Sequence, residues 1–178
     1  VTLPSEIVNS GTYVLVGAHS DSLWGKSQLH RHPQIVRWWH VDNTSMQVGN
    51  AFGGPIYIGI EAGSTLGEFD ITISNAVKAP RYIHGETDVF QWLQQYRHDP
   101  APWAEIGSDQ FILTVPSHEI RDLDNPQDLM DWWDEALGME HEIYGYTPWP
   151  RVERAVFDAQ ISAGWMHSGY PFMAHDLS

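Results

Sequence analysis

The sequence predicts an α+β fold, in which an antiparallel β-sandwich precedes a part that mixes helices with strands. Two observations predict this division. Short strand-like runs separated by glycine-rich turns continue to about residue 73, and helix signals appear only after Pro80. A length of 178 residues suits one ordinary domain or two small ones. We therefore expect a β-sandwich subdomain over residues 1–73 and an α+β part over residues 74–178.

Short apolar runs predict the strands of the sandwich. Glycines lie between these runs, where turns need a positive φ. One such turn, Gly53-Gly54-Pro55, leads into an apolar run and lacks the following helix that a phosphate-binding loop requires. The predicted strands cover residues 13–16, 35–41, 56–60 and 69–73.

Two helices are predicted in the second part. The first covers about residues 88–98, with Thr87 as its N-cap and Pro100 as its stop. The second covers about residues 126–143, because Asn125 can cap it and Pro126 suits its first position. The apolar positions of the first helix are Val89, Phe90, Leu93 and Tyr96, and those of the second are Leu129, Trp132, Trp133, Ala136 and Leu137.

The segments around these helices complete the predicted order. A loop is expected over residues 99–109, because prolines punctuate its start. Strands are expected over residues 111–115 and 154–160, and an irregular stretch over residues 161–178.

Composition narrows the function. The net charge of −14 would repel phosphate backbones and anionic lipids, so nucleic acid is an unfavourable partner. The absence of cysteine excludes disulfides, thiolate metal sites and cysteine nucleophiles. No apolar run approaches the length of a membrane span. Nine tryptophans exceed the usual share, and although most rings are expected in the core, flat indoles also suit sugars.

The zinc motif HExxH is absent. It works because two histidines one helical turn apart bind the metal, with a glutamate between them as general base. His118 and His141 are each followed by glutamate, but no second histidine follows at the required position. We expect both to belong to surface pairs.

Other catalytic arrangements are equally incomplete. His30 and His32, with His40 near them in sequence, form the closest histidine pair, and a polar loop is expected there rather than a metal site. Ser64 and Ser168 lack the GxSxG elbow that exposes a serine nucleophile.

Two segments have the composition of binding loops. Residues 157–173 bring together polar side chains, aromatic rings and two glycines, and residues 100–105 hold an indole between prolines. Packed connecting loops explain the same composition equally well. The candidate binding residues of the two loops are Trp103, Glu105, His167, Ser168 and Tyr170.

The sequence resembles the enhancin-type, mucin-degrading zinc metallopeptidases over nearly its whole length. The segments that carry the resemblance are GTYVLVGAHSD at 11–21, GGPIYIGI at 53–60, PAPWAEI at 100–106, FILTVPS at 111–117, LDNPQDLMDWWDEAL at 123–137 and VFDAQISAGWMHSGYPFM at 156–173. The resemblance implies a β-sandwich followed by the α/β first part of a gluzincin-like catalytic domain. It also implies secretion, zinc in the complete family domain, and cleavage of O-glycosylated proteins.

The resemblance places the zinc-binding helix of the family after the MHSGYP segment, and these 178 residues do not contain it. None of the histidines present matches a family ligand, so no zinc is expected on this chain alone. The resemblance instead implies that His167, Ser168 and Tyr170, with Trp103 and Glu105, line the substrate cleft. Apolar surface on Trp165, Met166 and Phe172 is then expected to be exposed, and to cause self-association or reduced stability of this chain alone.

Three functional hypotheses follow. The chain is a peptidase portion that shapes the cleft for an O-glycosylated protein, with the remainder of the peptidase domain as its partner. Alternatively it is a non-catalytic β-rich module that binds glycans or glycoproteins, or a structural domain that has lost its site. A zinc-binding motif in a longer chain favours the first, and glycan binding without chemistry favours the second.

Overall fold

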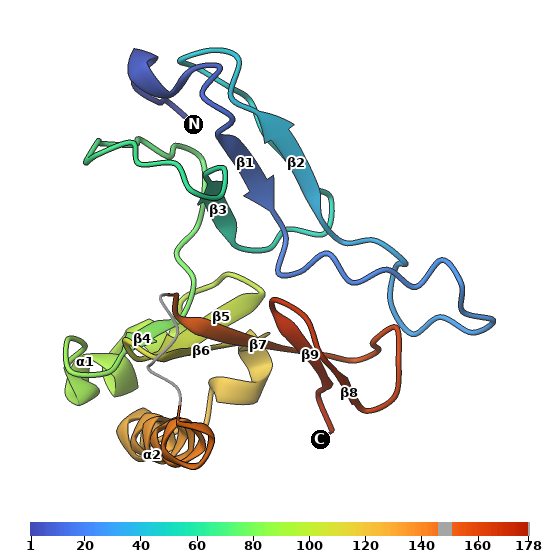
Figure 1. Ribbon diagram of the computed structural model, residues 1–178, viewed down its shortest axis with the longest axis vertical. Coiled ribbons are helices and arrows are strands. Elements are labelled where there is room, and N and C mark those ends of the chain that lie inside the picture. Colours follow the sequence, from blue (N-terminus) through green and yellow to red (C-terminus); the bar gives the residue numbers. More distant parts are fainter. Residues whose placement is uncertain (146–150, 178) are drawn as a thin grey trace. The chain divides into compact units, whose positions relative to one another are not determined.

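The computed structural model describes residues 1–145 and 151–177 and has the predicted α+β class (Figure 1). The chain divides into two units, which we describe separately. The first unit contains residues 1–20 and 35–77, and the second contains residues 21–34 and 78–177 as far as the description extends. Residues 21–34, which we call the excursion, therefore interrupt the first unit in the sequence but belong to the second unit in the folded chain.

The first unit is built on a three-stranded antiparallel sheet with the order β2-β1-β3. Its strands are β1 (Tyr13–Val16), β2 (Arg37–His40) and β3 (Ile56–Gly59), preceded by a 3₁₀ turn, η1 (Ser5–Ile7). Central β1 places Val14 opposite Trp39 on one side and Ile58 on the other. The prediction of strands in these three regions is confirmed.

The predicted strand over residues 69–73 is wrong. Thr72 makes only an isolated bridge to Thr2, which also bridges Ser45. The layer that packs on the sheet is thus extended chain joined by single bridges. Apolar side chains join this layer to the sheet in one core, whose buried members are Leu3, Ile7, Val14 and Val41 and whose partly buried members include Met46, Ile58, Leu66, Phe69 and Ile71.

The second unit contains a six-stranded mixed sheet with the order β4-β5-β6-β7-β9-β8. The β5–β6 and β9–β8 pairs are antiparallel, and the other pairs are parallel. The strands are β4 (Arg81–Ile83), β5 (Trp103–Gly107), β6 (Phe111–Pro116), β7 (Glu153–Asp158), β8 (Met166–His167) and β9 (Phe172–His175).

Three of these strands correct the sequence-based expectations. β5 lies inside the predicted loop 99–109, where Ala104 and Ile106 alternate into the core as a strand requires. β8 and β9 lie inside the predicted irregular stretch 161–178, where they pair with each other and β9 pairs with β7. Both errors concern short segments whose strand character depends on pairing with other strands and not on their own pattern alone.

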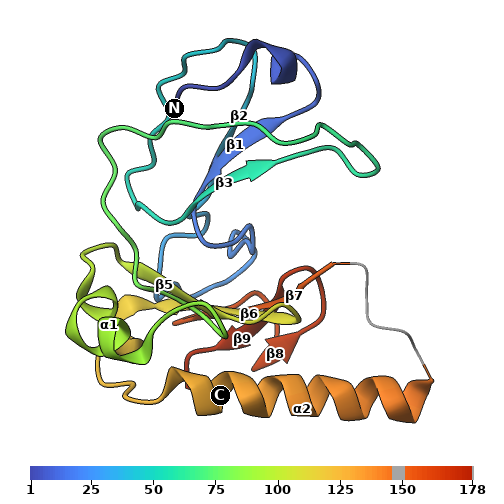
Figure 2. The same ribbon diagram turned by 90° about the vertical axis from the view of Figure 1, so that its left-hand side faces the viewer.

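The helices cover one face of this sheet (Figure 2). α1 (Val89–Gln94) begins at Asp88, whose carboxylate accepts a hydrogen bond of 2.9 Å from the Gln91 N–H, and 3₁₀ turns η2 (Tyr96–His98) and η3 (Ser117–Ile120) follow. Thr87 is therefore not the cap that we expected, because its hydroxyl accepts a hydrogen bond from the Ile83 N–H. Phe90, expected on the apolar face, is exposed.

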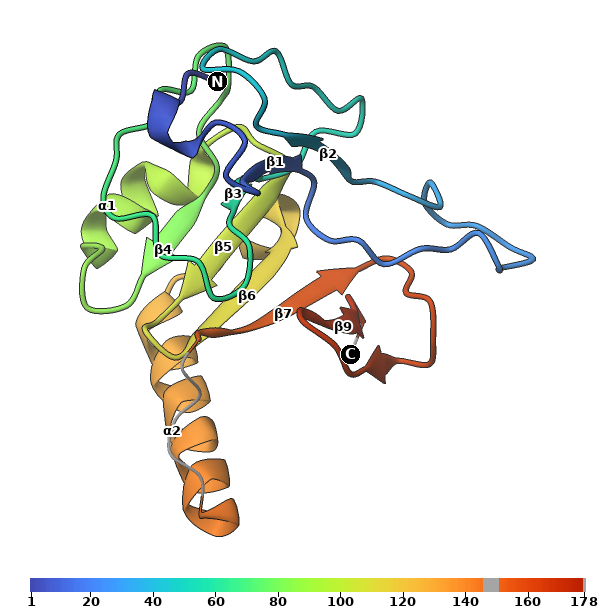
Figure 3. The ribbon, with the colours of Figure 1, turned by 45° about the horizontal axis from the view of Figure 1, so that its top comes forward.

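Helix α2 (Pro126–Tyr144) confirms the second predicted helix. The Asn125 side chain accepts from the Asp128 N–H at its start, and Gly145 ends it with a φ of 67°. Trp133 stacks on Phe111 at 4.5 Å between ring centroids, whereas Trp132 is exposed, contrary to the prediction. Most residues in the last turns of α2 are also exposed, because these turns extend beyond the sheet (Figure 3). Among the described residues, no helix is long and apolar enough to cross a membrane.

Gly17 and Gly54 of the first unit approach each other so closely that neither tolerates a side chain. Gly54 has a φ of 113°, and a Cβ added to it would lie 2.5 Å from the Gly17 Cα. Because this neighbour is backbone, it cannot rotate away. Gly54→Ala should therefore lower the free energy of unfolding by at least about 2 kcal/mol in chemical denaturation.

Gly138 provides the matched control, since it lies within α2 and an added Cβ would meet nothing within 4 Å. Gly138→Ala should raise the free energy of unfolding by roughly 0.5–1 kcal/mol. Equal effects of the two substitutions would contradict the close approach at Gly54.

Tyr82 makes the stability of the second unit sensitive to alkaline pH. Burial raises the pKa of Tyr82 above its ordinary value of 10.0, and Asp131 raises it further. The unfolded chain loses this proton first, so stability should be complete below about pH 10 and fall as pH rises toward the folded pKa. Unfolding followed between pH 8 and 11 should show a smaller decline for Tyr82→Phe. Tyr170→Phe, at an exposed tyrosine, should leave the decline unchanged.

Candidate functional site

The excursion 21–34 is attached to the end of β7 by a buried ion cluster. The Arg31 Nε lies 2.5 Å from the Asp158 Oδ2, and the Arg31 Nη2 lies 3.4 Å from the Asp21 Oδ2. The three side chains are at most 9% exposed. We call these residues the Asp21–Arg31–Asp158 cluster. One cation faces two carboxylates here, so the cluster carries a formal charge of −1.

Main-chain groups complete the attachment. The Arg31 Nε also donates to the Gln160 carbonyl oxygen at 2.9 Å. The Gln160 side chain accepts from the His30 N–H at 2.7 Å and donates to the Gln28 carbonyl oxygen at 2.9 Å. The loop after β7 and the excursion are therefore joined at several points.

Asp21 connects the cluster to the predicted binding loop. Its Oδ2 accepts a hydrogen bond of 2.7 Å from the Ser162 N–H, and its Oδ1 lies 3.5 Å from the His167 Nε2. The Ser162 Oγ lies 3.2 Å from the same His167 nitrogen. The His167 Nδ1 faces the Ser168 carbonyl oxygen at 3.2 Å. Because one ring nitrogen faces both the serine and the aspartate, this arrangement is not a nucleophile–base–acid relay.

The electrostatics of the cluster suit anchoring. Burial lowers the pKa of Arg31, and the charges of Asp158 and Asp21 oppose that change. A guanidinium begins so far above neutral pH that it stays charged. Neither carboxylate is left without a cation, which is the condition under which buried charges are tolerated.

The other predicted site residues lie elsewhere. Trp103 and Glu105 are on β5, not in a loop, and the Glu105 Oε1 accepts from the Arg154 Nη1 at 2.7 Å and the Thr114 hydroxyl at 3.2 Å. Three strands separate β5 from β8, which at the usual spacing is about 19 Å. The structure thus does not bring Trp103 and Glu105 together with His167.

Tyr170 and Ser168 lie beside His167 in the chain, and both are exposed. The Tyr170 hydroxyl donates to the Val152 carbonyl oxygen at 2.8 Å, and the Arg151 guanidinium lies 3.9 Å from the centre of its ring. Trp165 and Met166 are exposed as expected, whereas Phe172 is half-buried against the core.

The described residues do not fit a zinc site. No group of three or more His, Asp or Glu side chains within residues 1–145 and 151–177 is placed to hold a metal ion. His30 and His32 lie in the excursion, where the His32 Nδ1 faces the Gln34 carbonyl oxygen at 2.9 Å. His118 pairs with Glu119 at 2.9 Å on the surface, as predicted.

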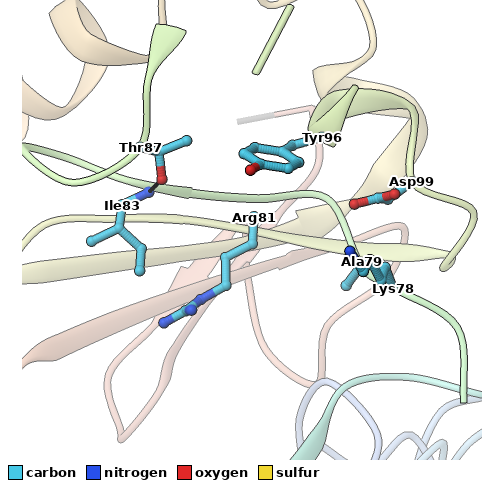
Figure 4. A pocket seen from close by; sticks show the side chains of 7 residues that line it. All are labelled: Lys78, Ala79, Arg81, Ile83, Thr87, Tyr96 and Asp99. Carbon is cyan, nitrogen blue, oxygen red and sulfur yellow. Dashed lines mark hydrogen bonds between the residues drawn. The ribbon is translucent and has the colours of Figure 1, made fainter. Parts of the chain in front are cut away.

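A hollow of about 350 Å³ lies beside β4, at the edge of the six-stranded sheet opposite to β8 (Figure 4). Figure 4 shows Tyr96 and Asp99 on one side of the strand and the Arg81 side chain pointing to the other. Its lining residues are Lys78, Ala79, Arg81, Ile83, Thr87, Tyr96 and Asp99. Charged side chains that point apart do not converge on one ligand, so we assign no chemistry to this hollow.

Sequence reasoning missed Asp21 and Arg31. Arg31 lies between His30 and His32, and the spacing of these histidines suggests a metal site and not an ion pair of the arginine. A lone arginine beside a distant aspartate gives no local signal, because their contact depends on the folded chain.

Arg31→Ala should destabilise the second unit strongly, since it leaves Asp21 and Asp158 buried without their cation. We expect a loss of about 3–5 kcal/mol in the free energy of unfolding. Arg151→Ala is the control, because the Arg151–Glu153 pair is 54% and 25% exposed and should contribute less than about 1 kcal/mol. Equal losses in chemical denaturation would show that the cluster does not anchor the excursion.

Comparison with solved structures shows the same fold in two Clostridium perfringens proteins. The ZmpB metallopeptidase matches 92% of this chain and 38% of its own with a TM-score of 0.61 and 12% identity. The M60 catalytic domain of ZmpC, solved in complex with the sialyl T antigen, matches 98% of this chain and 39% of its own with a TM-score of 0.57 and 10% identity.

Sequence relatives with higher identity carry a different name. TRPM8 channel-associated factor 2 of Bos taurus is 42% identical over 93% of this chain and 18% of its own length. A TRPM8 channel-associated factor homolog of Xenopus laevis is 43% identical over 97% of this chain and 19% of its own. The chain thus spans about a fifth of the length of these relatives.

Family models account for the whole chain. Residues 1–74 match the N-terminal domain of M60-like peptidases. Residues 75–178 match peptidase M60, enhancin and enhancin-like, which is more than half of the chain. This chain therefore belongs to the M60 family of enhancin and enhancin-like peptidases.

Proposed function

We propose that this chain is the N-terminal part of a secreted zinc metallopeptidase that cleaves O-glycosylated, mucin-type proteins. Its own part is to shape the substrate cleft. Family membership supports a peptidase, and the glycan held by the related ZmpC domain supports a glycosylated substrate. The zinc ligands of this proposal lie outside the described residues, which contain no suitable group.

Strand β8 is the observation that carries the proposal. It ends the six-stranded sheet, so one of its sides has no neighbouring strand among the described residues. An extended peptide can add to such an edge through main-chain hydrogen bonds. Trp165 and Met166 are 61% and 64% exposed beside this edge, as a substrate-contacting segment requires.

The Asp21–Arg31–Asp158 cluster gives this edge a fixed position. Asp21 holds both Ser162 and His167, which lie on either side of the exposed segment. The proposal keeps His167, Ser168 and Tyr170 as cleft-lining residues. Trp103 and Glu105, on β5, stay predictions for a separate part of the sheet.

A second candidate is non-catalytic binding, as a glycoprotein-binding module or as part of a channel-associated protein. The identity of 42–43% with TRPM8 channel-associated factors favours it, against 10–12% with the two peptidases. Co-precipitation of the full-length protein with TRPM8 tests the channel partner.

The test of the proposed function is cleavage of a mucin-type glycoprotein by the full-length protein with zinc. Cleavage should require the O-glycans and should stop on chelation. Met166→Pro removes an edge N–H and should lower kcat/KM at least about tenfold, whereas Met166→Ala keeps the edge and should retain most activity. Binding of the glycoprotein without cleavage would support the second candidate, and cleavage indifferent to glycosylation would overturn the proposed substrate.

A further inference from the structure

The excursion 21–34 presents one tryptophan on an anchored turn. The Lys26 N–H donates to the Leu23 carbonyl oxygen at 2.9 Å and closes the turn Leu23–Lys26. Leu23 is fully buried, and its N–H donates to the Pro33 carbonyl oxygen at 2.9 Å. Trp24, the next residue, is 69% exposed. Burial of one residue thus fixes the exposed indole beside it.

The Asp21–Arg31–Asp158 cluster holds the base of this turn in place. Arg31 and Asp21 bind the two ends of the excursion to the end of β7 and to the loop after it. The turn also has an internal support, because the His32 and Trp24 rings make a T-shaped contact at 6.1 Å between centroids and 80° between planes. A T-shaped contact covers at most one face of the indole, so at least one face stays open to a ligand.

The turn Leu23–Lys26 contains one cation and no acidic side chain. The chain carries a net charge of −14, yet residues 22–34 contain no Asp or Glu and include Lys26 and Arg31. Arg31 is engaged in the cluster. Lys26 is exposed, and its ammonium group has no hydrogen bond or ion pair with any residue in the described parts of the chain. A free ammonium therefore lies two residues from a free indole face.

We propose that the turn Leu23–Lys26 binds an acidic sugar of an O-linked glycan. The indole face of Trp24 packs on the C–H face of the sugar ring, and the Lys26 ammonium pairs with the sugar carboxylate. This inference rests on the proposed function, because it assumes a glycosylated substrate, and it adds a contact on the excursion that the cleft at β8 does not include.

The surroundings of Trp24 favour a sugar over an apolar protein surface. Its exposed neighbours within residues 22–28 are Ser22, Gly25, Lys26, Ser27 and Gln28, which offer hydrogen-bonding groups to hydroxyls, and Leu29 beyond them is the other exposed apolar side chain of the excursion. A protein hot spot instead places its aromatic anchor inside a well-packed apolar pocket. An anionic ligand also finds at this turn a local cation in a chain that otherwise repels it.

The experiment measures binding of three peptides to the full-length protein by calorimetry, with a chelator present so that no cleavage consumes them. One peptide carries sialyl T antigen, the second carries the same glycan without sialic acid, and the third carries no glycan. Trp24→Ala should weaken binding of both glycopeptides about tenfold. Lys26→Gln should weaken only the sialylated peptide, to the level of the desialylated one.

Trp132→Ala is the matched control, since Trp132 is 59% exposed on α2 and should leave all three affinities unchanged. Unchanged thermal unfolding of the Trp24→Ala and Lys26→Gln variants should confirm that the turn still folds. Wild-type glycopeptide binding that Trp24→Ala does not alter overturns this inference alone. Equal binding of all three peptides also overturns it and identifies a polypeptide site, whereas no glycopeptide binding by the wild type overturns the proposed substrate as well.

Discussion

The buried pairing of Arg31 with Asp21 and Asp158 is the interaction on which the arrangement of the second unit depends. It joins a segment from the N-terminal part of the sequence to the end of β7, and through Asp21 it holds Ser162 and His167. Buried carboxylates need a cation, so the excursion cannot leave without exposing them or stranding their charge. The physical boundary between the units therefore differs from the boundary in sequence.

The second unit has one sheet face that helices cover and other segments that are exposed. Helices α1 and α2 cover one face of the sheet, where Trp92, Met130 and Ile106 are fully buried. Two of its exposed segments, the β8 edge and the turn Leu23–Lys26, are attached to the same cluster. An anchored base beside an exposed strand and an exposed indole would suit the extended glycosylated chain that we propose as substrate, because little ordering is left to occur on binding.

The fold and the sequence relatives place this chain in one family and leave its activity as a proposal. Structures at 10–12% identity share the architecture, which by itself does not fix a function. The relatives at 42–43% identity are named for association with a channel. An open sheet edge is compatible with cleavage or with binding of an extended peptide, since the difference lies in a metal centre that the described residues do not supply.

The sequence by itself determined the elements that depend on local chemistry: strand β1, whose bounds match the prediction, and helix α2, whose cap at Asn125 and end at Gly145 are encoded in neighbouring residues. The tertiary structure decided β5, β8 and β9, because short segments become strands only beside their partners. It also decided the site. His167 was named from the sequence, but its partner Asp21 and the anchoring Arg31 were not, because Arg31 lies 129 positions from Gln160, which it contacts. Such contacts arise only when folding brings distant segments together, so composition and spacing do not predict them.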